Sequence, residues 1–415
     1  MSDTAPAVPV LTVETVELDT IGPLVPLLDS RDPLLFIRRG QGIAGIGEAF
    51  RLEFSGEDRM RDAATAWRQI VSAANISDAV QLPGTGLVAL GSFAFSRGSA
   101  ATSVLIVPSV IVGKRAGRAW ITRITSDAAA PSAATPTATA FGPEYRISLL
   151  PGSMKADAFT AAVDAAIAAI DAGSVRKVVI ARDLVGHLPE GADVRRVLHD
   201  LAIGYPDCFT YAVNGLVGSS PETLVCVDHG EVGARVLAGS IGRGSDAESD
   251  QEAAVSLATS SKDLDEHAYA LASVLRVLEP HSNTLTTSEL PFTLKLPNLW
   301  HLASDVEGRL GDGSSSLDLI AALHPTAAVA GAPTGAAMDL IEQLEPFDRG
   351  RYAGPVGWVD ARGDGEWAVA LRCAHVSSTG RVTAYAGAGI VRGSEPLREL
   401  AETKMKFRPI VEAFG

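Results

Sequence analysis

Cysteine is scarce in this sequence of 415 residues, which contains Cys208, Cys226 and Cys373 and no other cysteine. An odd number of cysteines without metal-ligand spacing predicts neither a disulfide framework nor a cysteine-bound metal. Free cysteine is among the most often buried residue types. Cys208 and Cys226, which flank apolar runs, are therefore predicted to be core residues.

Positively charged residues are also few. The chain has 35 lysines and arginines and 49 aspartates and glutamates, which gives a net charge of −14. Nucleic acids and anionic membranes need a clustered positive surface, so we expect neither as a partner. A small anionic substrate is compatible with this balance, since a few local cations suffice to bind it.

Long apolar runs are missing as well. No run reaches the ~18 residues of a membrane-spanning helix, and the first residues lack the cationic and then apolar stretch of a secretory signal. Hydrophobic residues nevertheless make up 47% of the chain and charged residues 20%, which is ordinary for a globular protein with a sizeable core. We expect a cytoplasmic protein.

The N-terminal third is predicted to be rich in strands. Residues 1–12 are expected to form a loose tail, and residues 13–150 a β-rich part of the same body as residues 151–415. Residues 126–140 are low in complexity and are predicted to form a flexible surface loop. Short apolar runs between glycine-rich turns predict strands at 34–38, 50–54, 86–95, 104–112 and 119–124.

The rest of the chain alternates between helical and strand-like patterns. In the helix predicted for residues 156–172, Phe159, Val163 and Ile167 recur at helical spacing, and Gly173 follows as a stop signal. Strands adjacent in sequence with helices at the flanks indicate an α+β fold with antiparallel-rich sheets. The other predicted helices are 193–203, 249–278, 316–323, 335–344 and 396–414, and the predicted strands are 175–184, 208–217, 223–227, 232–238, 284–290, 299–307, 354–360, 367–375 and 381–386.

One glycine motif is a weak cofactor signal. Gly40-Gln-Gly42-Ile-Ala-Gly45 matches the dinucleotide-binding pattern G-x-G-x-x-G, which requires a strand before it and a helix after it. Residues 48–54 instead alternate in polarity like a strand. We therefore expect no dinucleotide cofactor.

Two ionisable residues stand where burial would make them reactive. Lys177 lies within the apolar run Arg-Lys-Val-Val-Ile-Ala-Arg, and Glu222 follows Ser-Ser-Pro at the end of a predicted strand. Taken alone, the first would be an edge-strand lysine reaching solvent and the second a turn glutamate. A lysine acts as a general base only where burial or nearby positive charge lowers its pKa, and an apolar strand offers that setting.

Two further carboxylates, Glu266 and Glu402, lie on separate predicted helices, where a solvated face is the default. Glu402 and Lys406 are four residues apart, so both project from one helix face. This pair is either a surface ion pair worth roughly 0.3–0.5 kcal/mol, or a metal ligand beside an ammonium group that binds a substrate carboxylate. Mg²⁺ is commonly held by one or two carboxylates.

An anion site is indicated near the C-terminus. Arg372 lies in the otherwise apolar run Val-Ala-Leu-Arg-Cys-Ala, where burying its charge without a partner would be costly. The glycine-rich segment 385–390 follows one strand later, and glycines let backbone N–H groups approach an anion closely. The last helix then begins, which adds its positive end to the same region.

These motifs resemble those of the chorismate-utilising enzymes. Besides the segments that carry Lys177, Glu222, Glu266 and Glu402, segments 237–240, 324–331 and 386–391 match the family in the family's order. The resemblance covers about residues 150–414 and extends more loosely into the N-terminal third. It implies one large α/β body with two stacked antiparallel sheets, helices outside, and a deep cleft that uses Mg²⁺.

The resemblance also implies roles for single residues. It makes Glu266 and Glu402 the Mg²⁺ ligands, Lys177 the general base and Glu222 the general acid. In one place the chain departs from the family, because Ser240-Ile-Gly-Arg243 replaces the more common Thr-Arg-Pro-Arg. The positions that match the family's substrate contacts are Gly239, Ser240, His301, Ala328, Val329, Tyr352, Arg372, Gly387, Ala388, Gly389 and Lys406.

Two places distinguish the members of the family. Members that add water have the lysine found here as Lys177, whereas members that add ammonia lack it. Segment 324–331, with Ala328 and Val329, is similar to that of isochorismate synthases. The resemblance thus implies a monomeric, Mg²⁺-dependent isochorismate synthase that acts on chorismate, for menaquinone or siderophore biosynthesis. The alternatives are a salicylate synthase, an amine-adding anthranilate or aminodeoxychorismate synthase, and a non-catalytic chorismate-binding protein.

Overall fold

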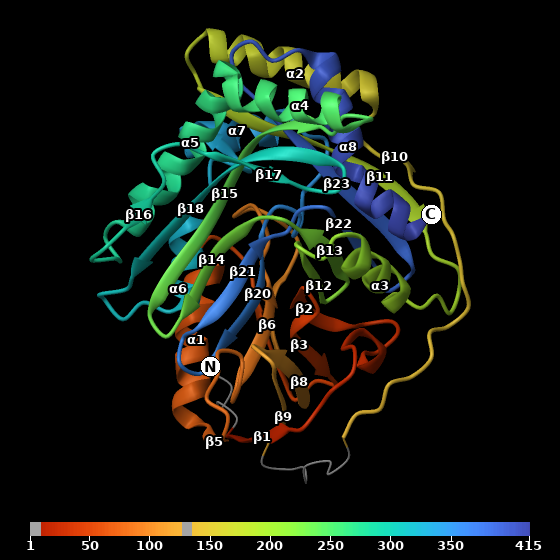
Figure 1. Ribbon diagram of the computed structural model, residues 1–415, viewed down its shortest axis with the longest axis vertical. Coiled ribbons are helices and arrows are strands. Elements are labelled where there is room, and N and C mark those ends of the chain that lie inside the picture. Colours follow the sequence, from red (N-terminus) through yellow and green to blue (C-terminus); the bar gives the residue numbers. More distant parts are fainter. Residues whose placement is uncertain (1–9, 127–134) are drawn as a thin grey trace, which may run out of the picture.

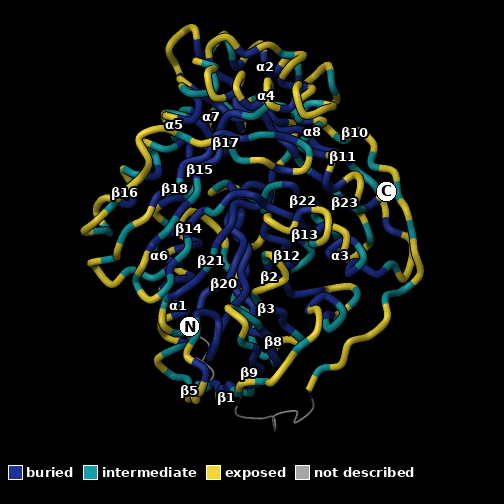
Figure 2. Tube along the Cα trace, in the orientation of Figure 1, coloured by how far each residue is buried: buried dark blue, intermediate teal, exposed yellow. Residues whose placement is uncertain are grey.

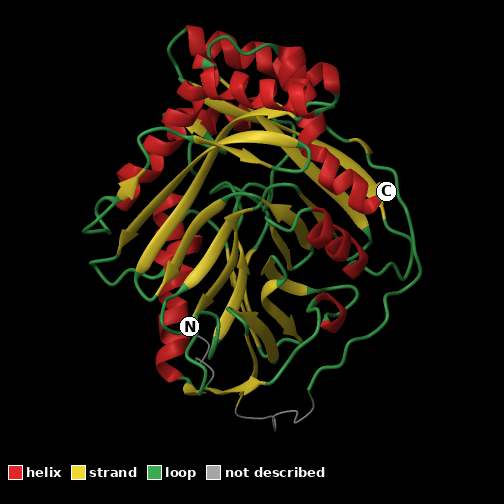
Figure 3. Ribbon diagram, viewed as in Figure 1, coloured by secondary structure: helices red, strands yellow, loops and turns green. Residues whose placement is uncertain are grey.

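Two large β-sheets stack against each other, with helices around them (Figures 1 and 3). The computed structural model describes residues 10–126 and 135–415. Most of the expected tail and much of the expected loop at 126–140 therefore lie outside the described residues. The α+β architecture of two stacked, antiparallel-rich sheets surrounded by helices is confirmed.

The first sheet contains strands from both ends of the chain. Its order is β10-β11-β23-β22-β13-β12-β2-β3-β8-β9-β1-β5, and β19 pairs with β11 outside this path. Among the described strands only β1 and β5 pair in parallel. The bounds are β1 Leu11–Leu18, β2 Leu34–Arg38, β3 Gln41–Ile46, β5 Asn75–Asp78, β8 Val110–Arg115, β9 Arg118–Ser126, β10 Leu150–Pro151, β11 Lys177–His187, β12 Phe209–Val213, β13 Leu216–Ser220, β19 Gly331–Ala332, β22 Cys373–Val376 and β23 Arg381–Ile390.

The second sheet is antiparallel throughout its described part. Its order is β16-β18-β15-β14-β21-β20-β6-β7-β4, and β17 also pairs with β18. Strand β6 from the N-terminal third pairs with β20, just as β2 pairs with β12 in the first sheet. The bounds are β4 Phe50–Phe54, β6 Val88–Ser92, β7 Ser103–Val107, β14 Thr223–Asp228, β15 Glu231–Gly242, β16 Thr286–Thr287, β17 Phe292–Lys295, β18 Leu299–Arg309, β20 Pro355–Asp360 and β21 Gly365–Val369.

Helices flank both sheets, and none in the described ranges is long and apolar enough to cross a membrane. In α1 the buried residues Met60, Ala63, Trp67 and Ile70 recur at helical spacing, so one face packs on the core. The bounds are α1 Arg59–Ala73, α2 Ala156–Asp171, α3 Arg195–Gly204, α4 Ala247–Thr259, α5 Ser261–Leu278, α6 Ser316–Leu323, α7 Thr334–Leu344 and α8 Pro396–Phe414, besides the short 3₁₀-helix η1 Val25–Leu27.

The core lies between the sheets and under the helices, as the buried trace in Figure 2 shows. Strand β1 alternates, with Leu11 and Val13 buried and Thr12 and Glu14 exposed, because only one of its faces meets the core. The first eight residues of β11 are all buried. That pattern explains why the apolar residues 178–181 follow one another without alternation, since a strand covered on both faces has no solvent side.

Most of the predicted elements of the second half are confirmed, including α2, α3, α6, α7 and α8. The glycine motif at 40–45 forms β3 and is followed by β4, as expected, rather than by a helix. Sequence patterns did not reveal β1, β3 and α1. Cys208 and Cys373 are buried, whereas Cys226 is partly exposed.

Several predicted boundaries were wrong because a turn interrupts an apolar run. Residues 104–112 form β7 and β8, which meet at Pro108, and 208–217 contain a hairpin that turns at Asn214 and Gly215, both with positive φ. Only Thr286–Thr287 is a strand within 284–290. Residues 249–278 form two helices, because the Ser260 side chain accepts a hydrogen bond from the Asp263 N–H and caps α5.

Two further corrections bear on the anion site. Segment 367–375 is broken into β21 and β22, and Arg372 lies in the interruption with φ +48° instead of within a strand. Strand β23 continues to Ile390, so the glycine-rich segment belongs to the strand and forms no turn.

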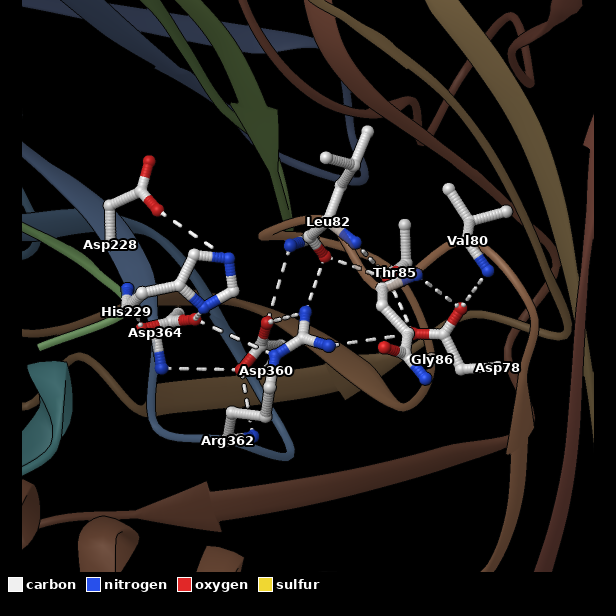
Figure 4. A network of polar contacts seen from close by, with 12 residues as sticks. Asp78, Val80, Leu82, Thr85, Gly86, Asp228, His229, Asp360, Arg362 and Asp364 are labelled. Atoms are coloured by element: carbon white, nitrogen blue, oxygen red, sulfur yellow. Dashed lines mark hydrogen bonds and ion pairs between the residues drawn. The ribbon is translucent and has the colours of Figure 1, made fainter.

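Arg362, in the turn between β20 and β21, lies among three carboxylates (Figure 4). Its guanidinium is 3.0 Å from Asp360 Oδ2 and 3.5 Å from the Oδ2 atoms of Asp78 and Asp364. Asp78 ends β5 of the first sheet and Asp360 ends β20 of the second, so the cluster links the two sheets. Burial raises the pKa of Asp360 to about 6, although the charge of Arg362 opposes that rise.

Replacing Arg362 by methionine is expected to lower the free energy of unfolding by about 2 kcal/mol at pH 8, because Asp360 and Asp364 then lack a counter-charge. Since the pKa of Asp360 is raised in the folded state, its neutral form favours folding at low pH and this contribution is lost as pH rises toward about 6. The cost of Arg362→Met should therefore be smaller at pH 5 than at pH 8. Urea unfolding at both pH values measures it.

The matched control is Arg39→Met, which removes an ion pair with Asp207 whose two side chains are 69% and 58% exposed. That variant is expected to change stability by less than about 1 kcal/mol at either pH. An equal loss for Arg362→Met at pH 5 and pH 8 would contradict the interpretation of the cluster.

Candidate active site

A cavity lies where β11 and β23 approach β15, β18, α5 and α8. Most of the residues predicted to bind substrate or to react line it. Lys177 and Glu402 are not in the lining but form ion pairs with lining residues, and Ala388 lies between two of them. The predicted residues in the lining are Glu222, Gly239, Ser240, Glu266, His301, Ala328, Val329, Tyr352, Arg372, Gly387, Gly389 and Lys406.

Lys177 begins β11 and its side chain is fully buried. Its Nζ atom is 3.1 Å from Glu266 Oε1 on α5, and it makes no properly oriented hydrogen bond within the described chain. Burial of a charged amine is costly unless it is paired. The solvent-exposed edge lysine that the sequence alone allowed is therefore excluded, and Lys177 is held beside the cavity with a hydrogen-bonding position to spare.

Glu222 reaches the cavity from the connection between β13 and β14. Pro221 cannot donate to a strand ladder and ends β13 at Ser220, and the Glu222 N–H donates to Ser220 Oγ over 3.2 Å. Burial raises the pKa of Glu222 to about 8, against the lowering effect of the nearby charges of Lys177 and Arg372. Its carboxyl group is therefore mostly protonated at neutral pH and can donate a proton.

Arg372 and His301 form a short chain of hydrogen bonds at another wall. An Arg372 Nη atom donates to His301 Nε2 over 3.1 Å, and His301 Nδ1 lies 3.2 Å from the Gly239 carbonyl oxygen, to which it donates. This arrangement requires a neutral imidazole, and burial, followed by the charge of Arg372, holds the pKa of His301 well below its usual range. Arg372 has no ion-paired carboxylate within the residues that the structure describes, so its charge is available to an anion.

The carboxylates predicted to hold a metal lie on two helices that converge at the cavity. Glu266 comes from α5, and Glu402 comes from α8, where Lys406 Nζ is 2.5 Å from Glu402 Oε1. Lys406 Nζ also donates to the Gly387 carbonyl oxygen over 3.0 Å. The helical spacing of Glu402 and Lys406 thus serves a buried site and not a surface ion pair.

Two more acidic residues, Glu399 and Asp263, lie near the predicted metal ligands. Burial and then the charge of Glu402 raise the pKa of Glu399, while burial is the main cause of the raised pKa of Asp263. Carboxylates crowded in this way repel one another, and a divalent cation would relieve that repulsion. The described residues contain no group of three or more His, Cys, Asp or Glu arranged to hold a metal. Two carboxylates with open positions fit Mg²⁺, which keeps several waters or substrate oxygens.

The sequence did not reveal some residues of the cavity wall. Tyr385 stacks on Tyr352, with ring centroids 5.2 Å apart and planes at 14°, and both line the cavity. Val179 follows Lys177 by two residues, so strand alternation could have indicated that both face the same side. The further lining residues that were missed are Pro221, Leu237, Ala238, Leu371 and Ala386.

Comparisons with known proteins show the family to which the chain belongs. The family model described as chorismate binding enzyme matches residues 11–415. The isochorismate synthase DhbC of Bacillus subtilis is 41% identical over 265 residues, which are 61% of this chain and 66% of that enzyme. The chain thus spans about two thirds of the length of that relative.

Solved structures share the whole architecture. DhbC of Bacillus anthracis superimposes with a TM-score of 0.78 at 31% identity, covering 94% of this chain and 98% of that one. The menaquinone-specific isochorismate synthase MenF of Escherichia coli gives a TM-score of 0.77 at 23% identity, covering 98% and 95%. The second likeness concerns the fold alone.

Gly389 is a position where any side chain would meet Glu266 and Lys177. A Cβ atom there would overlap Glu266 Oε1 and lie 3.2 Å from Lys177 Cε. We expect Gly389→Ala to displace the Glu266 carboxylate and to weaken Mg²⁺ binding by roughly tenfold, as measured by isothermal titration calorimetry. Gly335→Ala is the control, because a Cβ on that helical glycine meets no atom within 4 Å. Unchanged Mg²⁺ affinity in Gly389→Ala would contradict the assignment of Glu266.

Proposed function

The chain belongs to the family of chorismate-binding enzymes, and we propose that it is an isochorismate synthase, which converts chorismate reversibly to isochorismate. The observation that carries this proposal is the burial of Lys177 and Glu222 beside one cavity. The names of its relatives support the same reaction. The single-residue roles below are part of the proposal.

Cations on two walls of the cavity bind the substrate, whose carboxylates they neutralise. Arg372 and Lys406 supply the charges, and the strand around Gly387 and Gly389 lets the backbone approach the substrate closely. Tyr352 and Val329 cover the ring. This local positive field explains how a chain with a net charge of −14 can bind an anion.

In the proposed reaction, a water molecule adds to the substrate ring at C2 and the hydroxyl group at C4 leaves. Lys177, neutral when it reacts, takes a proton from a water molecule whose oxygen bonds to ring C2. The ring double bonds shift, the C4–O bond breaks, and the departing hydroxyl leaves as water with the proton of Glu222. A positioned acid or base of this kind contributes about 10²–10⁴-fold in rate. In the reverse reaction Lys177 acts as the acid and Glu222 as the base. Because one hydroxyl group is exchanged for another, the reaction needs neither ATP nor a redox cofactor.

Glu266 and Glu402 would hold the metal ion, for which their carboxylate oxygens are suitable hard ligands. Bound Mg²⁺ supplies positive charge that fixes a substrate carboxylate. Glu266 also pairs with Lys177, so the same side chain links the metal position to the base. Chorismate is then the substrate, and we propose that the chain acts as a monomer.

Product analysis tests the proposal directly. The wild-type protein incubated with chorismate and Mg²⁺, with and without ammonium, is expected to yield isochorismate as the main product on reversed-phase chromatography. A Lys177→Ala variant should lose nearly all of this activity. Salicylate plus pyruvate as the early products would instead indicate a salicylate synthase. Anthranilate or aminodeoxychorismate would show that ammonia is the nucleophile. The absence of any product would indicate a non-catalytic chorismate-binding protein.

The pH profile tests Glu222 as the acid. Because its pKa is raised to about 8, kcat/KM should be limited by loss of the protonated form above pH 8, falling about tenfold per pH unit. Glu222→Gln should lower the rate by about 10²–10⁴-fold and remove that alkaline limb.

The matched control is Glu342→Gln, at an exposed position on α7. It should keep both the rate and the profile of the wild type. An alkaline limb that persists unchanged in Glu222→Gln would assign the titration to another group.

A further inference from the structure

Strand β11 has an unusual outer edge at the residues that follow Lys177. On one side β11 pairs with β23 along nearly its whole length. On the other side it pairs with β19 only at Lys177 and Val178, and with β10 only at Leu184 and Val185. Backbone groups between these two short strands would be left without partners, and buried unpaired groups of this kind are costly.

A buried ion pair fills this gap. Glu345 Oε1 accepts a hydrogen bond from the Ala181 N–H over 2.7 Å, and an Arg349 Nη atom donates to the Val179 carbonyl oxygen over 2.8 Å. Glu345 and Arg349 lie 2.6 Å apart, with side chains that are 1% and 2% exposed. The two side chains thus satisfy the strand edge where a neighbouring strand would otherwise do so.

The same guanidinium reaches the loop on the far side of the gap. Arg349 Nη1 donates to the Val329 carbonyl oxygen over 2.9 Å, and the Val179 N–H donates to the Ala330 carbonyl oxygen over 2.8 Å. Val179 and Val329 both line the cavity. The planar guanidinium group of Arg349 therefore fixes the spacing between β11, which carries Lys177, and the loop that contains Val329.

Arg349 also supports the stacked tyrosines. Its guanidinium carbon is 5.7 Å from the centroid of the Tyr352 ring and 4.4 Å from that of Phe95. The Tyr352 N–H donates to the Arg349 carbonyl oxygen over 3.0 Å, in the turn that leads to β20. Three separate parts of the cavity wall thus meet at this one side chain.

We propose that the Glu345–Arg349 pair is a positioning device that sets the location of Lys177 relative to the bound ring, and that Arg349 is a positioning residue of the reaction. This inference rests on the proposed function, in which Lys177 is the base. Arg349 touches no reacting atom. It acts through the backbone of β11 and of the Val329 loop, so its loss affects the chemical step more than the capture of substrate.

The test substitutes lysine for arginine, which keeps the charge and the ion pair with Glu345 but removes the planar fork. Arg349→Lys is expected to lower kcat by about 10–100-fold, since a displacement on the order of 1 Å costs about that much. The KM for chorismate should stay within about threefold.

The chain offers a matched control in a second buried arginine–carboxylate pair. Arg195 and Asp193 lie 2.7 Å apart with side chains 5% and 3% exposed, and Arg195 donates to the carbonyl oxygens of Leu28 and Ala140. None of these residues lines the cavity. Arg195→Lys should lower the melting temperature by an amount similar to Arg349→Lys but leave kcat at the wild-type value.

Wild-type kcat in Arg349→Lys would overturn the inference, as would an equal loss of kcat in Arg195→Lys. If Arg349→Lys does not fold, the same kinetic comparison is made with Glu345→Gln. This variant keeps an acceptor for the Ala181 N–H. A wild-type enzyme that makes a different product would overturn the proposed function alone. The comparison of kcat between the variants is valid for whichever product forms.

Discussion

The burial of one lysine is the constraint on which the rest of the site depends. A charged amine removed from water is costly unless an opposite charge accompanies it, and here Glu266 lies 3.1 Å from Lys177 Nζ. That contact requires α5 to approach β11 closely, and the approach is possible because Gly389 on the neighbouring strand has no side chain. Strand β11 is in turn covered on both faces in this fold of two stacked sheets with outer helices.

Opposite electrostatic conditions within one cavity follow from this arrangement. Glu222 lies among apolar and cationic neighbours and holds its proton near neutral pH, while Glu266 and Glu402 are ion-paired with lysines and suit a hard cation. The neutral His301 accepts a hydrogen bond from Arg372 and donates one to the Gly239 carbonyl oxygen. It thus orients the guanidinium group of Arg372 without cancelling its charge.

The ion pairs around Arg362 and the Glu345–Arg349 pair lie in different parts of the fold and make different contacts. The cluster around Arg362 joins the ends of the two sheets (Figure 4), and none of its members lines the cavity. The Glu345–Arg349 pair, by contrast, occupies the place of a neighbouring strand beside β11, which carries Lys177. Buried ion pairs are weak evidence for stability in general. The contacts of each pair therefore matter more than its burial, and the Glu345–Arg349 pair is bonded to the backbone of the strand that carries Lys177.

The sequence by itself determined the types of chemistry and the regular elements. Helical periodicity located α2, α6 and α8, and the motifs around Lys177, Glu222, Glu266 and Glu402 indicated the candidate acid, base and metal ligands, because these signals are local in the chain. Only the tertiary structure decided that Lys177 is buried, that burial raises the pKa of Glu222 to about 8, and that Arg372 leaves the strand with φ +48°. It also brought Val179 and Tyr385 into the cavity. Burial and electrostatic environment arise from residues that are distant in the sequence, and periodicity along the chain carries no information about such neighbours.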